Sequence, residues 1–114
     1  MENQDPRNAP PGIGQRPRVD RSGWPKTIAG AVNVLLTKLS EGDLQTIRGL
    51  ERPQDMTRFH FSLGLWIRNN FGLWQGNEAL LTECCGDWFK EPDHASGVIM
   101  EALWKRLHEQ EHQP

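Results

Sequence analysis

Apolar positions recur at helical spacing along most of the chain. The first such stripe starts after Pro25 and predicts an amphipathic helix whose buried face is Ile28, Ala31, Val32, Leu35, Leu36 and Leu39. Ser40 with an acid at Asp43 is typical of a helix N-cap, so a second, short helix should follow. We expect Gly49 to end that helix in a left-handed conformation.

The next apolar stretch predicts a third helix, from about Gln54 to Phe71. One side of it carries Met56, Phe59, Leu63, Trp66, Ile67 and Phe71, and Phe61 and Leu65 occupy the opposite side. A helix so nearly encircled by apolar residues is expected at the centre of a fold. Gly72 is the expected C-terminal glycine, turning Leu73 back onto Ile67.

Two further helices complete the predicted fold. Asn77 is a candidate cap for a fourth helix that runs through Leu80 to Trp88, and Asp93 is a candidate cap for a fifth. The fifth would bury Ala95, Val98, Ile99, Ala102, Leu103 and Leu107. No segment alternates with period two, so we predict a single compact all-α domain of about five helices over residues 23–110.

Residues 1–22 have a different composition. They hold four of the eight prolines and four arginines, with Ile13 and Val19 as the large aliphatic residues, which is too little apolar surface to offset the entropy of ordering. We predict a disordered tail with a charge of +1, attached to a body with nine basic and twelve acidic groups. An acidic body argues against nucleic-acid binding, which usually needs a basic face.

The sequence predicts a cytoplasmic protein. It lacks a run of ~20 apolar residues and the apolar core of a signal peptide. Its two cysteines, Cys84 and Cys85, are adjacent, a spacing at which an internal disulfide is strained. They fit two small buried hydrophobic residues in a reducing compartment.

Motifs for catalysis or cofactor binding are weak. The run from His108 to His112 matches the zinc-protease pattern literally, but it is wholly polar, terminal and without a third ligand. The glycines of Gly12–Gly14 are preceded by prolines and followed by no strand, which disfavours a phosphate-binding loop. We therefore predict no metal, no cofactor and no catalytic residue, and expect the protein not to be an enzyme.

The run from Trp66 to Trp74 sets a cation and two amides among large apolar side chains. A structural interpretation is that Arg68 favours the helix C-terminus and Asn70 bonds the following connection, with His60 as a satisfied polar neighbour. A functional interpretation is that these groups bind an anionic or planar ligand in a groove. The binding residues would then be Arg68, Asn69, Asn70 and Asn77, with Trp66 and Trp74 at the rim.

Five tryptophans and no tyrosine are unusual in so small a domain. A core of about 90 residues cannot fully enclose five indoles and pair each N–H, so one or two should be partly exposed. Trp24, at the tail junction, and Trp104, off the main stripe of its helix, are the best candidates for interface anchors.

The segment Phe59-His60-Phe61-Ser62-Leu63-Gly64-Leu65 followed by Trp66 to Trp74 resembles a family of small bacterial domains of unknown function. The segments at 76–81 and 93–104 fit it too, so the resemblance covers about residues 25–107. It implies a fold and a bacterial or phage origin, but no activity.

Two functions remain open from the sequence. The first is a small non-enzymatic protein-binding module, of an accessory or immunity type, that occupies a partner's surface. The alternative is a small-molecule or nucleotide-signal binder that uses a polar pocket around Arg68, Asn69 and Asn70. Burial of Arg68 is the feature that separates them.

Overall fold

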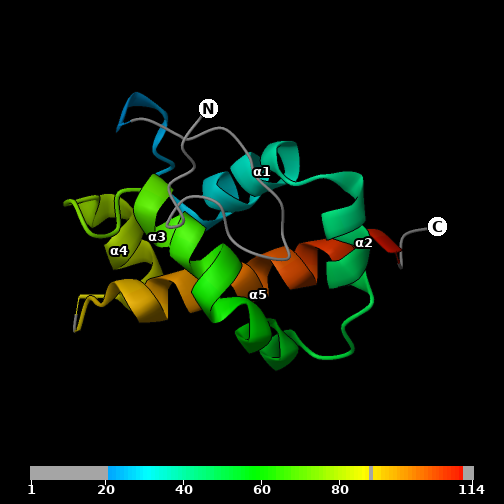
Figure 1. Ribbon diagram of the computed structural model, residues 1–114. Coiled ribbons are helices and arrows are strands. Elements are labelled where there is room, and N and C mark those ends of the chain that lie inside the picture. Colours follow the sequence, from blue (N-terminus) through cyan, green and yellow to red (C-terminus); the bar gives the residue numbers. More distant parts are fainter. Residues whose placement is uncertain (1–20, 88, 112–114) are drawn as a thin grey trace.

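The fold is all-α over the residues that the computed structural model describes, 21–87 and 89–111 (Figure 1). Five α-helices form it: α1 (Ile28–Lys38), α2 (Glu41–Arg48), α3 (Leu65–Asn70), α4 (Glu78–Cys85) and α5 (Pro92–Glu111). A short 3-10 turn, η2 (Arg21–Gly23), leads in, and two further helical segments precede α3: η3 (Pro53–Phe59) and η4 (His60–Gly64). The predicted fold class and helix number are confirmed.

The first two helices begin where the sequence predicts. Thr27 caps α1, and Ser40 and Asp43 form a reciprocal capping box at the start of α2, which satisfies two backbone N–H groups. The prediction for Gly49 is wrong, because its φ is −77°. Its N–H bonds the carbonyls of Gln45 and Thr46, so the helix ends by tightening, without a left-handed residue.

The predicted third helix is wound in three different ways. It starts at Pro53 as a 3-10 helix, loosens into a π-helical turn over His60–Gly64, and becomes α-helical only at Leu65. A 3-10 helix has fewer residues per turn than an α-helix and a π-helix has more, so the average spacing of apolar residues stays close to that of an α-helix. The sequence pattern therefore could not distinguish this segment from one regular helix. Phe61, on the π-helical turn, is 81% exposed.

The central helix is α5, and the prediction that the 54–71 helix is central is wrong. α5 crosses the middle of the molecule and packs against α1, α2, η3, η4, α3 and α4 (Figure 1). Its length allows one stripe to contact all of them, whereas the 53–70 segment keeps one side in solvent. The core that α5 organises consists of apolar residues from every α-helix, among them Leu35, Ile47, Met56, Leu63, Trp66, Phe71, Leu80, Ile99 and Leu103.

Two starting and ending positions differ from the prediction. Asp93 lies inside the first turn of α5, after Pro92, and is not its cap. α4 ends at Cys85, before Gly86 with φ +77°, so it stops short of Trp88. Trp88 and the predicted tail up to residue 20 lie outside the described residues.

The connection from α3 to α4 is built around Gly72 and Asn77. Gly72 has φ +73°, as a C-terminal glycine should, and its carbonyl accepts the N–H groups of Gln75 and Asn77. A Cβ at Gly72 would lie 2.5 Å from ring atoms of Trp24, so the indole packs directly on this glycine. Trp24 thereby belongs to the domain and holds the connection in place.

Candidate functional site

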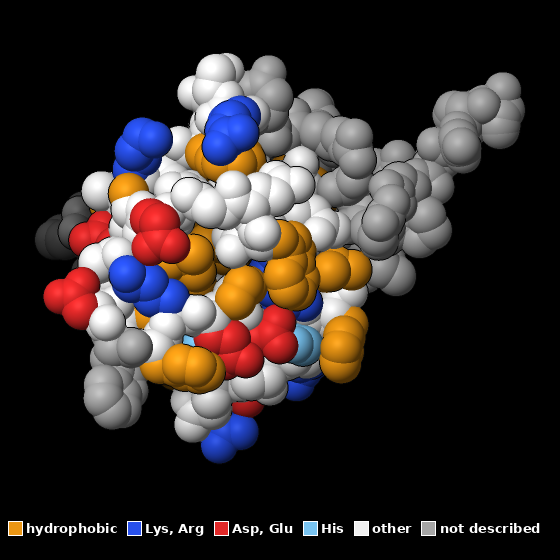
Figure 2. All heavy atoms as spheres, turned by 90° about the vertical axis from the view of Figure 1, so that its left-hand side faces the viewer, with side chains coloured by type: hydrophobic (Ala, Val, Ile, Leu, Met, Phe, Trp, Pro, Cys, Tyr) orange, Lys and Arg blue, Asp and Glu red, His pale blue; other side chains and the backbone are white. Residues whose placement is uncertain are grey.

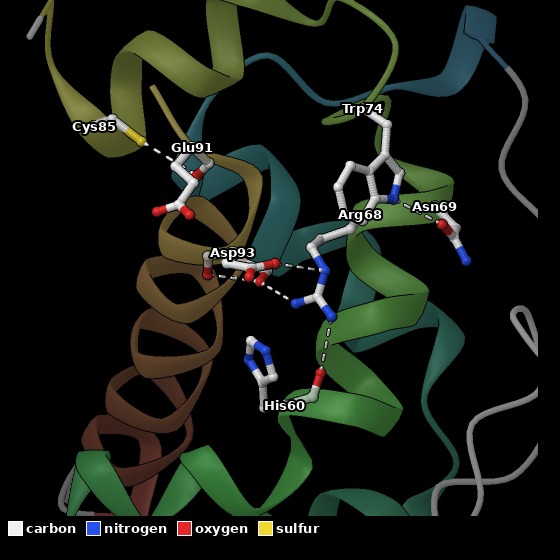
Figure 3. Close-up of polar contacts among 8 residues, drawn as sticks. His60, Arg68, Asn69, Trp74, Cys85, Glu91 and Asp93 are labelled. Atoms are coloured by element: carbon white, nitrogen blue, oxygen red, sulfur yellow. Dashed lines mark hydrogen bonds and ion pairs between the residues drawn. The ribbon is translucent and has the colours of Figure 1, made fainter. Parts of the chain in front are cut away.

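Arg68 lies near the end of α3 and is enclosed by protein. The residue is 3% exposed, and each guanidinium nitrogen faces an oxygen of the chain (Figure 3). Nη1 donates to Ser96 Oγ at 2.8 Å, Nη2 donates to the His60 carbonyl at 3.2 Å, and Nε lies 3.3 Å from Asp93 Oδ1. The Nε contact is an ion pair without hydrogen-bond geometry. The cation therefore joins α3, the π-helical turn and the first turns of α5.

The electrostatics of this group follow from its burial. Desolvation lowers the pKa of Arg68, and the carboxylate of Asp93 acts in the opposite direction. Because guanidinium starts from a very high value, it stays charged, and the buried charge is balanced by a carboxylate whose side chain is 51% exposed. The result is an ion pair with one member in the interior and one at the surface.

Two other predicted residues join Arg68 at this place. The Trp74 indole lies over the guanidinium, with Arg68 Cζ 5.9 Å from the ring centroid, and its Nε1 donates to Asn69 Oδ1 at 2.8 Å (Figure 3). Trp74 is nevertheless 54% exposed. Asn69 thus orients an indole that the surrounding protein covers on one side only.

Trp66 and Asn70 do not line a groove, which corrects the functional interpretation of the sequence. Trp66 is 0% exposed and packs edge-on against Phe71, and Asn70 is 2% exposed and donates to the Trp66 carbonyl at 2.9 Å. Residues four apart share one helix face, and the burial of both shows that this face of α3 points into the core.

Asn77 and Trp104 lie elsewhere. Asn77 is buried, caps α4 through the Leu80 N–H, and donates to the carbonyls of Pro25 and Phe71. Trp104 is half-buried near the other end of α5, where its Nε1 donates to the Leu50 carbonyl at 2.9 Å. The polar groups of both side chains are therefore used in hydrogen bonds to the backbone.

Three residues of this site were not predicted. Asp93 was predicted only as a helix cap, yet both Asp93 and Ser96 face Arg68, and Ser96 also donates to the Asp93 carbonyl. Gly64 leaves room for the guanidinium, since a Cβ there would lie 3.0 Å from Arg68 Nη1. The i,i+3 spacing of Asp93 and Ser96 is the signal that could have found them, because it places both on one face at the start of the helix.

Large apolar side chains are exposed around this centre. Among the described residues they are Phe61, Trp74 and Phe89, at 81%, 54% and 65% exposure. The Phe61 ring packs edge-on against the His60 ring with 4.8 Å between centroids, and the His60 carbonyl accepts a hydrogen bond from Arg68, which lies against Trp74. His60 and Arg68 therefore link the two exposed aromatic residues. We call the surface formed by Phe61, His60, Asp93 and Trp74 the Phe61–Trp74 face.

Cysteine and metal-ligand chemistry is limited in the rest of the described chain. Cys84 and Cys85 are free thiols, and burial raises the pKa of Cys84 to about 12, which disfavours a reactive thiolate. Over residues 21–87 and 89–111 no three histidine, cysteine or acidic side chains come together as metal ligands, while His112 lies outside this range. Within the same range, no helix has the length and apolar character to cross a bilayer.

Comparison with known proteins gives the family. Residues 24–107 match the family described as domain of unknown function DUF6794, and the chain belongs to it. No curated protein and no solved structure matches the chain.

Proposed function

We propose that this member of the family is a small non-enzymatic protein-binding module that acts by occupying a surface of its partner through the Phe61–Trp74 face. The observation that carries the proposal is the pair of large aromatic side chains, Phe61 and Trp74, that stay in solvent while their ring neighbours His60 and Arg68 belong to a tightly bonded polar centre. Exposed tryptophan and aromatic residues are frequent anchors of protein interfaces.

Rigidity of the anchor supports this role. Trp74 is oriented by Asn69 and Arg68, and its loop is fixed by the two bonds to the Gly72 carbonyl and by Trp24 beneath it. A side chain held in place before binding loses little conformational freedom when a partner covers it. An exposed aromatic so held is better suited to recognition than a flexible one.

The alternative, a small-molecule or nucleotide-signal binder at Arg68, is less well supported. An anion would have to displace contacts to Ser96, Asp93 and the His60 carbonyl from a guanidinium that is 3% exposed. The enclosure of Arg68 favours the structural interpretation of this residue. A cytoplasmic setting, with free thiols, and a bacterial or phage source are parts of the same proposal.

Site-specific photo-crosslinking in the cells that carry the gene tests the proposal. Benzoylphenylalanine at position 74 keeps a large aromatic side chain there and should give a discrete protein adduct, and the same residue at Glu41, exposed on α2, should not. Excess unlabelled protein should suppress the adduct, whereas excess Trp74→Ala protein should not. Identical products from positions 74 and 41 would contradict the proposal.

A further inference from the structure

We infer that the protein segment bound by the Phe61–Trp74 face is basic, with arginine or lysine side chains next to apolar ones. The inference rests on the proposed function and adds the chemistry of the partner. It is carried by the charges around the face and by the way Asp93 is held.

Negative charge is concentrated in the segment that leads through α4 to Asp93 of this face. Residues 78–94 hold five acidic side chains and one basic one, a formal charge of −4, in a chain whose total is −2. The remainder of the chain is therefore positive. Figure 2 shows acidic side chains gathered in the middle of this side of the molecule, between separate hydrophobic patches. A field of one sign attracts a partner of the other.

The acidic groups at the start of α5 are only partly neutralised. Asp93 faces Arg68 through Oδ1, about half of its side chain is in solvent, and Glu91 is exposed beside it (Figure 3). The one basic residue of the segment, Lys90, is paired with Glu78 at 3.2 Å. Two carboxylates thus stand against one buried guanidinium, which leaves room for a cation supplied from outside.

The aromatic side chains determine the rest of the partner's chemistry. Arg68 already lies over the Trp74 ring at 5.9 Å, so a second cation stacked there would meet like charge. Apolar side chains of the partner are the better match for Trp74 and Phe61, with the basic side chains reaching Asp93 and Glu91. An acidic protein segment or a nucleic acid would be repelled by the same carboxylates.

Synthetic peptides test this inference directly. Calorimetric titration would compare a short peptide of alternating arginine and leucine with one of alternating glutamate and leucine and one of alternating arginine and glycine. We expect the arginine–leucine peptide to bind about tenfold more tightly than either other peptide, and added salt to weaken it.

Variants locate the binding. Trp74→Ala should weaken the arginine–leucine peptide by about tenfold or more, as loss of an anchor does. Glu91→Gln should weaken it by about twofold to fivefold, the effect of an exposed charge pair. The matched control is Glu109→Gln, an exposed glutamate on α5 about 24 Å along the helix from Asp93, which should change nothing. Circular dichroism confirms that each variant is folded.

Three results would overturn the inference: no binding of the arginine–leucine peptide, equal binding of the glutamate–leucine peptide, or equal binding by Trp74→Ala. The crosslinking experiment separates this failure from failure of the proposed function. A specific adduct at position 74 whose linked partner segment is neutral or acidic excludes a basic partner and leaves the protein-binding role intact. Absence of any specific adduct removes both.

Discussion

The two ends of α5 use polar groups in opposite ways. At its start, Arg68, Asp93 and Ser96 make the connection between helices, and the nearby Trp74 stays 54% exposed. Toward its end, Trp104 itself makes the connection, through its bond to the Leu50 carbonyl. His108 stacks on that indole with 3.9 Å between ring centroids, beside a shallow hollow of about 380 Å³.

The exposure of each of these two tryptophans depends on which side chain bonds the neighbouring elements together. Where an indole supplies the bond between elements, it is half-buried and its N–H is used by backbone. Where a guanidinium supplies that bond, the indole is left to face outward. Trp74, near the start of α5, is exposed because Arg68, and not the indole, makes the bonds that join the helices there.

Replacement of Arg68 should have the largest effect on stability and tests whether this residue joins the helices at the start of α5. Arg68→Ala leaves the Ser96 hydroxyl, the His60 carbonyl and one face of Asp93 without their partner, and we expect a loss of about 2 to 4 kcal/mol in the free energy of unfolding. Arg68→Lys should not restore it, because a point charge cannot reach three oxygens in a plane. Urea titration measures both. A loss below about 0.5 kcal/mol would return Arg68 to the role of a ligand-binding residue.

Gly72 tests whether the loop that carries Trp74 is rigid. Gly72→Ala places a methyl group against the Trp24 ring at a positive φ, so overpacking and backbone strain add to a cost of about 2 to 3 kcal/mol. Gly76→Ala is the matched control, since φ is +95° there but no atom lies within 4 Å of the new Cβ. Equal losses in thermal unfolding would mean that Trp24 does not hold the loop.

Trp104 and Trp74 give the direct comparison of the two ends. We expect Trp104→Ala to lower the free energy of unfolding by about 2 kcal/mol, since it removes the bond to the Leu50 carbonyl and part of the core packing. The loss should be smaller than the ~3 to 5 kcal/mol of a fully buried tryptophan, because Trp104 is half-buried. Trp74→Ala should cost less than about 0.5 kcal/mol, typical of surface positions, while weakening partner binding. Denaturant titration measures the free energy of unfolding of the two variants. Equal losses would show that the two tryptophans do not differ in their structural role. Weaker partner association by Trp104→Ala would bear out its predicted role as an anchor.

The smallest effect is expected from removing residues 1–20. Their composition offers no apolar face to the domain, so the thermal midpoint should stay unchanged as long as Arg21 to Trp24 are kept. Differential scanning calorimetry of the shortened chain measures this. A drop of several degrees would show that the segment packs on the domain.

Local signals in the sequence predicted local structure well. The Ser40 capping box, the Asn77 cap and the left-handed Gly72 each depend on side chains within a few residues of the helix end. The winding of residues 53–70 was missed, because the apolar stripe averages over tight and loose turns.

Long-range partners could not be predicted in the same way. Of the predicted binding residues, Arg68, Asn69 and Trp74 come together in the structure. Trp66 and Asn70 face the core, and Asp93 and Ser96 join Arg68 across 25 and 28 positions of chain. Only the packing of α3 against α5 decides which polar side chains come together, and that packing has no local signature.

Asn77 has a consequence for how the domain opens. Its single amide bonds the carbonyls of Pro25 and Phe71 and the N–H of Leu80, so it couples the lead-in to α1, the end of α3 and the start of α4. Segments joined at one point gain or lose their hydrogen bonds together. Amide hydrogens in these three places should therefore exchange with solvent as one cooperative unit, although 52 positions of chain separate the first bond's partners.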